Sequence, residues 1–201
     1  MTSDINTKPK PVVQTYSGRF INVLDIQPGD VDVQDIAHSL SLQCRFNGHC
    51  ERFYSVAQHC VLGARMLPLG RRLKFLKHDA PEYLTTDIPS PLKPHIEGFK
   101  SIETYVHGKI EEAFGLDAEA TSDAEVKEVD MRMLATEFRD VRRKKGDTSV
   151  WLSLSGIKPF DFKIRPWSPK KAEREYLRMY RKCIGYMTAW DRVLDFFGLI
   201  G

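Results

Sequence analysis

The spacing of apolar residues is the strongest constraint on the fold, because they recur every three or four positions along most of the chain. The clearest run spans residues 96–113 and carries Ile96, Phe99, Ile102, Val106, Ile110 and Ala113. This period places the side chains on one face of a helix. Gly115 is a natural end for that helix, since glycine readily adopts the left-handed conformation of a C-terminal cap. The chain is therefore expected to be mainly α.

Capping residues predict where other helices begin. Helix starts are expected at Asp32, Ser55, Ser122 and Ser168. Ser55 and Ser122 are each followed three residues later by glutamine or glutamate, which is the spacing of a capping box. Ser168 is followed by a proline, which suits the first helical position. A further helix is expected over residues 71–84, and the apolar residues from Trp190 to Phe197 are expected to pack against the core.

One segment favours a strand. Residues 20–26 (FINVLDI) are apolar and rich in β-branched side chains, and Pro28 and Gly29 follow as turn residues. The sequence contains no repeat, low-complexity block or linker-like stretch after the first dozen residues. We therefore expect a flexible tail over residues 1–14 and a single domain over residues 15–201.

The charge of the chain is nearly balanced, with 30 basic and 27 acidic residues. This balance does not indicate a stable nucleic-acid partner. No apolar run approaches the roughly 18 residues that span a bilayer, and the N-terminus lacks the apolar stretch of a secretory signal. A cytoplasmic location without a membrane partner is therefore expected. The four cysteines form no C-x-x-C pair, so they are expected to be reduced and not to bind zinc.

The segment Phe75 to Lys93 (FLKHDAPEYLTTDIPSPLK) carries the residues that indicate chemistry. His78 and Asp79 are adjacent, and on a helix Glu82 would lie one turn further along the same face. Burying these groups together is costly unless a cation compensates the two carboxylates. A divalent metal site is therefore one interpretation, although a lone histidine–aspartate pair is also common by chance.

Two more residues favour the metal interpretation. His59 lies on the preceding amphipathic helix, just after its capping box, and Asp130 lies on a later helix. The chain thus presents histidine, then histidine–aspartate, then aspartate, each on its own helix.

This order and its surroundings resemble the HD-domain phosphohydrolase superfamily. The similar segments are SVAQH (55–59), LKHDAPE (76–82), DIPSPLK (87–93), VDMRMLATE (129–137) and WSPKKAE (167–173). The resemblance covers most of residues 17–197 and is closest to bacterial 5′-deoxynucleotidases and phage dATP triphosphohydrolases. It implies a single-domain helical bundle of the HD type with a short β element near the N-terminus. It also implies a homo-oligomer, either a dimer or a hexamer, and a phage-encoded member would work in the host cytoplasm.

The resemblance also implies the roles of individual residues. The metal ligands would be His59, His78, Asp79 and Asp130. They would hold one divalent ion, and mixed nitrogen and oxygen ligation leaves Mn, Co, Zn, Fe and Mg open. Glu82 would position or deprotonate the attacking water, and Asp87 would contact the sugar or assist catalysis. The alternatives are a surface carboxylate for Glu82 and a turn-capping residue for Asp87.

Substrate contacts follow from the same resemblance. Arg45 and Phe46 match an arginine–aromatic pair that holds phosphate and stacks on the base, and arginine suits phosphate because it donates two parallel hydrogen bonds. Lys93 and Lys127 match positions that contact the phosphate tail. Phe46 could instead be a core aromatic, and Arg45 and Lys127 could be solvated surface charges.

Together these residues imply metal-dependent hydrolysis of deoxynucleoside 5′-phosphates. The leading version converts dATP to deoxyadenosine and triphosphate by water attack on the α-phosphorus, because three cations around one ion suit a triphosphate. The alternative in the same class is a 5′-deoxynucleotidase that acts on deoxynucleoside monophosphates. The alternative in another class is a catalytically silent module that binds nucleotides or nucleic acid.

Overall fold

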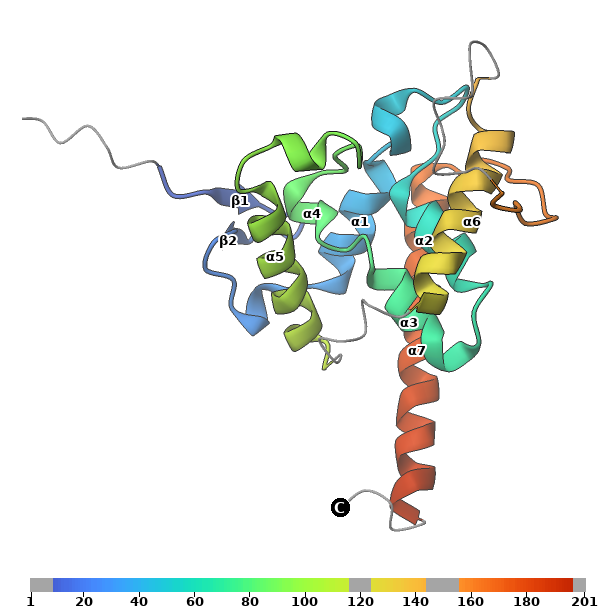
Figure 1. Ribbon diagram of the computed structural model, residues 1–201. Coiled ribbons are helices and arrows are strands. Elements are labelled where there is room, and N and C mark those ends of the chain that lie inside the picture. Colours follow the sequence, from blue (N-terminus) through green and yellow to red (C-terminus); the bar gives the residue numbers. More distant parts are fainter. Residues whose placement is uncertain (1–8, 116–123, 144–155, 197–201) are drawn as a thin grey trace, which may run out of the picture.

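The structure is a computed structural model that describes residues 9–115, 124–143 and 156–196, with side chains in the last range up to residue 185. It is mainly helical with one short pair of strands near the N-terminus, which confirms the expected fold class. The long helix α7 (Pro169–Phe196) packs against α1 (Val33–Leu42), α2 (Val56–Ala64) and α3 (Leu69–Lys77). The C-terminal turns of α7 extend beyond the other elements (Figure 1).

The other helices surround this group. The short helix α4 (Glu82–Thr85) contacts α1, and α6 (Ala124–Asp140) contacts α2. Helix α5 (Phe99–Ala113) packs against two 3-10 turns, Pro28–Asp30 and Lys93–His95. Helix α2 thus has neighbours from distant parts of the sequence, including α6 and α7.

The β element is a two-stranded hairpin. Strand β1 (Val12–Gln14) pairs with β2 (Phe20–Asn22) in antiparallel register, with Val13 opposite Ile21. The expected tail over residues 1–14 is therefore wrong at its C-terminal end, because β-branched valines find a partner strand there. The expected strand over residues 20–26 is too long, since the amide of Asp25 donates to the Asn22 carbonyl in a turn.

Most predicted helix ends are confirmed. The Asp32 side chain accepts from the Gln34 amide at 2.8 Å, and that of Ser55 accepts from the Gln58 amide at 3.1 Å. Ser168 directly precedes α7. Gly115 ends α5 in the left-handed region, at φ 63°. The start expected at Ser122 and the packing expected for residues 190–197 lie outside the residues and side chains that the structure describes.

The single helix expected over residues 71–84 is wrong. Helix α3 ends at Lys77, the chain turns through His78 to Pro81, and α4 begins at Glu82. Pro81 has no amide hydrogen and so cannot continue the hydrogen-bond ladder of α3. The break means that Glu82 does not lie one helical turn beyond His78, and its position relative to the metal residues is set by the turn.

The core joins α2, α3 and α7 closely. Gly63 on α2 faces the Phe75 ring, and a Cβ at that position would come within 2.1 Å of the ring. The hydroxyl of Tyr176 on α7 donates to the Leu76 carbonyl at 2.8 Å. These contacts fix α3, and with it the start of the turn that carries His78.

Two further expectations concern cysteines and membranes. All four cysteines are free thiols: Cys44, Cys50, Cys60 and Cys183. Within the described part of the chain, no helix combines the length and the apolar character that a membrane span requires.

Lys77, at the end of α3, is an unusual member of the core. Its side chain is 3% exposed, and its ammonium lies 3.1 Å from the centroid of the Phe114 ring without a hydrogen-bond acceptor among the described residues. Burial lowers the pKa of Lys77 from its usual value to about 6. The contact with the ring offsets only part of the cost of removing the charge from water.

Replacing Lys77 by methionine is therefore expected to raise the free energy of unfolding by about 2 kcal/mol at pH 7. Between pH 6 and 10 the unfolded chain binds the lysine proton more tightly than the folded one, so the wild type gains stability as the pH rises. The difference in the free energy of unfolding between Lys77→Met and the wild type should thus be largest near pH 6 and shrink towards pH 10. Urea titrations over this range test this, with Lys100→Met at an exposed site as the control. An advantage that grows with pH would contradict it.

Candidate metal centre

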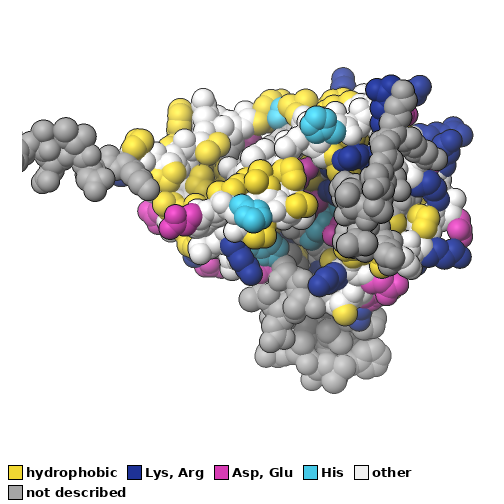
Figure 2. All heavy atoms as spheres, turned by 45° about the horizontal axis from the view of Figure 1, so that its top comes forward, with side chains coloured by type: hydrophobic (Ala, Val, Ile, Leu, Met, Phe, Trp, Pro, Cys, Tyr) yellow, Lys and Arg dark blue, Asp and Glu magenta, His cyan; other side chains and the backbone are white. Residues whose placement is uncertain are grey.

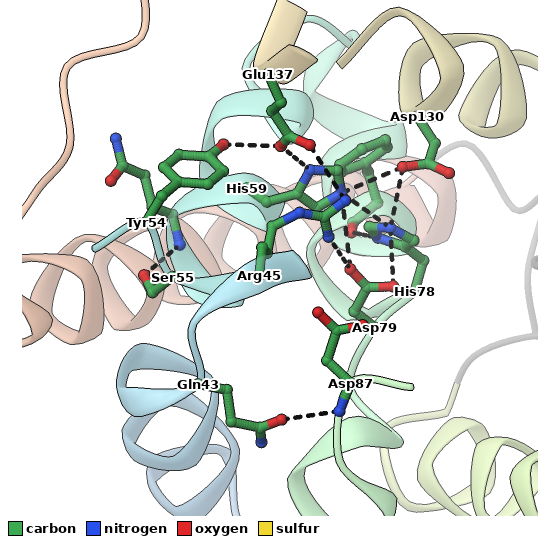
Figure 3. Close-up of polar contacts among 12 residues, drawn as sticks. Gln43, Arg45, Tyr54, Ser55, His59, His78, Asp79, Asp87, Asp130 and Glu137 are labelled. Atoms are coloured by element: carbon green, nitrogen blue, oxygen red, sulfur yellow. Dashed lines mark hydrogen bonds and ion pairs between the residues drawn. The ribbon is translucent and has the colours of Figure 1, made fainter. Parts of the chain in front are cut away.

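Two histidines and two aspartates from three parts of the chain converge beside α2 (Figure 3). The Nε2 atoms of His59 and His78 lie 3.2 Å apart. Asp79 Oδ1 lies 3.2 Å from Nε2 of His78, and its Oδ2 lies 3.7 Å from Nε2 of His59. Asp130 Oδ1 lies 3.2 and 3.7 Å from Nε2 of His59 and His78, respectively. The four residues predicted as metal ligands are therefore brought together.

The outer ring nitrogens show why both Nε2 atoms point inward. Nδ1 of His78 lies 2.6 Å from the Phe75 carbonyl, which can only accept a hydrogen bond. Nδ1 of His59 lies 2.6 Å from Oε1 of the buried Glu137. Each ring thus donates through Nδ1, and in a neutral ring Nε2 then carries a lone pair. This is the arrangement that metal-binding histidines usually have.

Two lone pairs that face each other at such a distance require a cation between them, either a proton or a metal ion. The ligand atoms of His59, His78 and Asp79 all lie within 4.8 Å of one another, so this group can hold a metal ion. Asp130 reaches the same two nitrogens from α6 and is partly exposed. Nothing in the geometry selects one divalent metal over another.

The charges around the imidazoles are strongly coupled. Burial and Arg45 lower the pKa of His59, but Glu137 and the bond to Asp130 outweigh them and raise it to about 9. Burial raises the pKa of Asp130, but its bonds to both histidines bring it well below its usual range. The carboxylates are therefore ionised and favour a cation at the point where the imidazoles meet.

Glu137 is a functional candidate that the sequence analysis missed. It is fully buried and accepts from the Tyr54 hydroxyl at 2.9 Å, in addition to its contact with His59. Its Oε2 lies 3.2 Å from the Arg45 guanidinium. Glu137 follows Asp130 by two helical turns on α6, a spacing that could have indicated that both face α2.

The guanidinium of Arg45 is paired with carboxylates through its two terminal nitrogens, while its Nε has no hydrogen-bond partner among the described residues. Its two terminal nitrogens each lie 3.2 Å from a carboxylate, one from Asp79 and the other from Glu137. Arg45 therefore connects Asp79, a candidate metal ligand, to Glu137, which orients His59 (Figure 3). Phe46 follows in a left-handed conformation at φ 56°, and the guanidinium carbons of Arg45 and Arg142 lie 5.5 and 5.0 Å from its ring centroid.

A cavity of about 470 Å³ adjoins His78 and Asp79, and we call it the metal-side cavity. Its lining includes His78, Asp79, Glu82, Lys93, Glu103 and His107. The view in Figure 2 shows histidine and acidic side chains together in a hollow, with lysine or arginine side chains beside it. The volume lies within the range of sites that bind small organic ligands.

Glu82 contributes a carboxyl group to this cavity. It is 6% exposed, and its Oε2 has no hydrogen-bond partner among the described residues. Burial, followed by the charges of Asp79 and Asp87, raises the pKa of Glu82 well above its usual range. Glu82 therefore lies at the same cavity as Asp79, as expected. It belongs to the separate helix α4, however, and not to α3.

Asp87 also lies close to the metal residues. Its side chain points towards Asp79 in Figure 3, and its amide donates to Oε1 of Gln43 at 3.1 Å. Burial raises the pKa of Asp87, Arg45 lowers it and Asp79 raises it again, and the net effect is upward.

The two lysines differ in their surroundings. Lys93 lines the metal-side cavity, but its ammonium is paired with Glu103 of α5 at 2.5 Å. Lys127 is exposed on α6, one turn before Asp130. Of the two expected phosphate contacts, only Lys93 thus lines the cavity.

The fold and the site define a mainly α protein with a partly buried group of histidines and carboxylates that can hold a metal ion. The chain is 37% identical over 178 residues to the uncharacterized protein YfdR of Escherichia coli strain K12, which covers 85% of this chain and 98% of YfdR. The chain therefore belongs to the YfdR family.

A second relative matches a shorter part of the chain. The chain is 38% identical over 112 residues to the uncharacterized protein RCAP_rcc00048 of Rhodobacter capsulatus, covering 51% of this chain and 57% of that protein. No protein-family model matches the chain.

Proposed function

We propose that the protein is a metal-dependent phosphohydrolase of the HD-domain type that hydrolyses deoxynucleoside 5′-phosphates. The observation that carries the proposal is the convergence of two imidazole Nε2 atoms and two aspartates next to a cavity of nucleotide size. His59, His78, Asp79 and Asp130 would be the ligands. A divalent ion held there would polarise a phosphate and make a bound water more acidic.

Other residues of the chain would accept a proton and contact the substrate. Glu82 would accept the proton of the attacking water, since it lines the metal-side cavity with Asp79 and its Oε2 has no hydrogen-bond partner among the described residues. The water oxygen would form a bond to phosphorus, the bond to the 5′-oxygen would break, and that oxygen would leave with a proton. Asp87, beside Asp79, would contact the sugar of the substrate.

The proposed reaction has two versions, which differ in the length of the phosphate chain of the substrate. In the first version the substrate is dATP and the products are deoxyadenosine and triphosphate. This version depends on Lys93 and Lys127 as contacts of the phosphate tail. The charges around the site favour the second version, a 5′-deoxynucleotidase. Arg45 already lies between two carboxylates and Lys93 is paired with Glu103, so little positive charge is left for a triphosphate tail. A monophosphate carries less charge and needs fewer cations.

The test is a substrate screen with chromatographic product analysis. The purified protein, loaded with Mn²⁺ or Co²⁺, is incubated with each of the four dNTPs and the four dNMPs. Release of a deoxynucleoside is expected, together with triphosphate in the first version or phosphate in the second. If no substrate yields a deoxynucleoside with any metal, the proposal fails. Salt-sensitive binding of single-stranded nucleic acid without turnover would then favour the silent module.

A further inference from the structure

A second cavity, of about 400 Å³, lies between the β hairpin and α1, and we call it the hairpin cavity. Its lining includes Tyr16, Asp35, His38, Ser39, Gln43 and Tyr83. Helix α4 contributes one residue to each cavity, Glu82 to the metal-side cavity and Tyr83 to the hairpin cavity. The two cavities are therefore distinct and share α4 as a wall.

The hydroxyl of Tyr83 is the first sign that the hairpin cavity binds a ligand. Tyr83 is 7% exposed, and its Oη has no hydrogen-bond partner among the described residues. A buried hydroxyl without a partner is costly and therefore rare. A ligand atom that accepts a hydrogen bond would remove that cost.

Asp35 supplies the complementary acceptor. It is 1% exposed, and its two oxygens accept from the amide and hydroxyl of Ser17 at 2.7 and 2.8 Å. Each carboxylate oxygen can accept more than one hydrogen bond, so Asp35 retains capacity for a donor. Burial and then the charge of Asp35 raise the pKa of Tyr83, so the two groups act on each other and the phenol remains a donor.

The walls of the hairpin cavity suit a flat ring. Tyr16 and His38 are stacked with ring centroids 3.5 Å apart and an interplanar angle of 11°. Tyr16 and Leu42 both line the cavity and are 68% and 55% exposed. An apolar rim above a few polar groups is the usual composition of a small-molecule site.

We propose that the hairpin cavity, through the unpartnered Tyr83 hydroxyl and the Asp35 carboxylate, binds a planar heterocycle with an amino group beside a ring nitrogen. The amino group donates to Asp35, and the ring nitrogen accepts from Tyr83. The flat ring lies against the stack of Tyr16 and His38. Amino-substituted nucleobases have this chemistry.

Gln43 connects the hairpin cavity to the metal centre. Its side chain lines the cavity, donates to the Glu82 carbonyl at 3.0 Å and accepts from the Asp87 amide at 3.1 Å. A bound ligand would therefore lie one side chain away from the backbone of Glu82 and Asp87, the two residues that carry the proposed catalytic carboxylates. The binding itself does not depend on the proposed function, so the two can fail separately.

The test uses titration calorimetry on the full, metal-loaded chain with adenosine and purine riboside, which differ only in the amino group. Adenosine is expected to bind, and purine riboside to bind about tenfold more weakly because the contact with Asp35 is lost. Tyr83→Phe should weaken adenosine binding by about tenfold while the variant stays folded, since it removes only an unpartnered hydroxyl. Leu42→Arg, at the exposed rim, should weaken binding without touching the core.

Thr104→Val is the matched control, because Thr104 lines the metal-side cavity. Adenosine binding should be the same in this variant as in the wild type. Three results would overturn the proposal: no adenosine binding at millimolar concentration, equal binding by Tyr83→Phe and the wild type, or a loss confined to Thr104→Val.

Discussion

Replacing Asp79 by asparagine is expected to remove most of the proposed phosphohydrolase activity and to weaken divalent-metal binding by at least about a hundredfold. Outer partners of metal ligands already contribute roughly tenfold to a hundredfold to affinity, so a ligand should contribute no less. Asparagine keeps the size of the side chain, but it removes the charge that faces both imidazoles at 3.2 and 3.7 Å. The rate of hydrolysis should fall by about a thousandfold or more, because the residues next to the substrate no longer hold the ion.

Fluorescence or calorimetric titration with Co²⁺ measures the affinity, and product release measures the rate. Asp161→Asn, at an exposed position in the segment before α7, is the control and should behave like the wild type. The Asp79→Asn variant also loses an ion pair with Arg45, so its folding is checked by circular dichroism. A folded variant that binds Co²⁺ as tightly as the wild type would show that Asp79 is not a ligand.

Replacing Glu137 by glutamine is expected to have the second-largest effect, on both stability and metal binding. The carboxylate accepts from Tyr54, contacts His59 and balances the charge of Arg45. Removing one partner of a buried ion pair typically costs about 3–5 kcal/mol, and Glu137 is fully buried. Metal affinity should also fall by roughly tenfold to a hundredfold, because Nδ1 of His59 would then donate to a neutral amide oxygen instead of a carboxylate, which makes the imidazole a weaker ligand.

The two effects of Glu137→Gln are separated by measuring urea unfolding with and without metal. Glu128→Gln, an exposed change on the same helix, is the matched control. Because the stabilisation by a bound ion depends on its affinity, the metal-induced gain in stability should be smaller in Glu137→Gln than in this control. An equal gain in both variants would mean that Glu137 supports the fold but not the metal centre.

Local sequence signals predicted the helices well and the non-local contacts poorly. Asp32 and Ser55 cap their helices because a cap depends only on the next few residues. The pairing of residues 12–14 with β2 was missed, since short strands are stabilised by a partner and not by their own sequence. The break between α3 and α4 had a local signal in Pro81, which has no amide hydrogen, but one continuous helix was expected over residues 71–84.

In the candidate metal centre, too, the contacts between distant residues could not be predicted from local sequence signals. The convergence of His59, His78, Asp79 and Asp130 followed from a resemblance, because no spacing rule relates residues on separate helices. Arg45 was expected to hold phosphate but lies between Asp79 and Glu137. The role of Glu137 depends on partners from three elements. A sequence gives the residue types of such a network, whereas the fold alone determines which of them meet.

The most direct test of the metal centre is X-ray absorption spectroscopy on protein titrated with Co²⁺ or Zn²⁺. The structure predicts one ion per chain, with scattering from two imidazole nitrogens and from carboxylate oxygens, and a weaker imidazole signal in each of the single variants His59→Ala and His78→Ala. An ion bound without imidazole ligands, or no stoichiometric binding at all, would contradict the convergence of these residues around a metal.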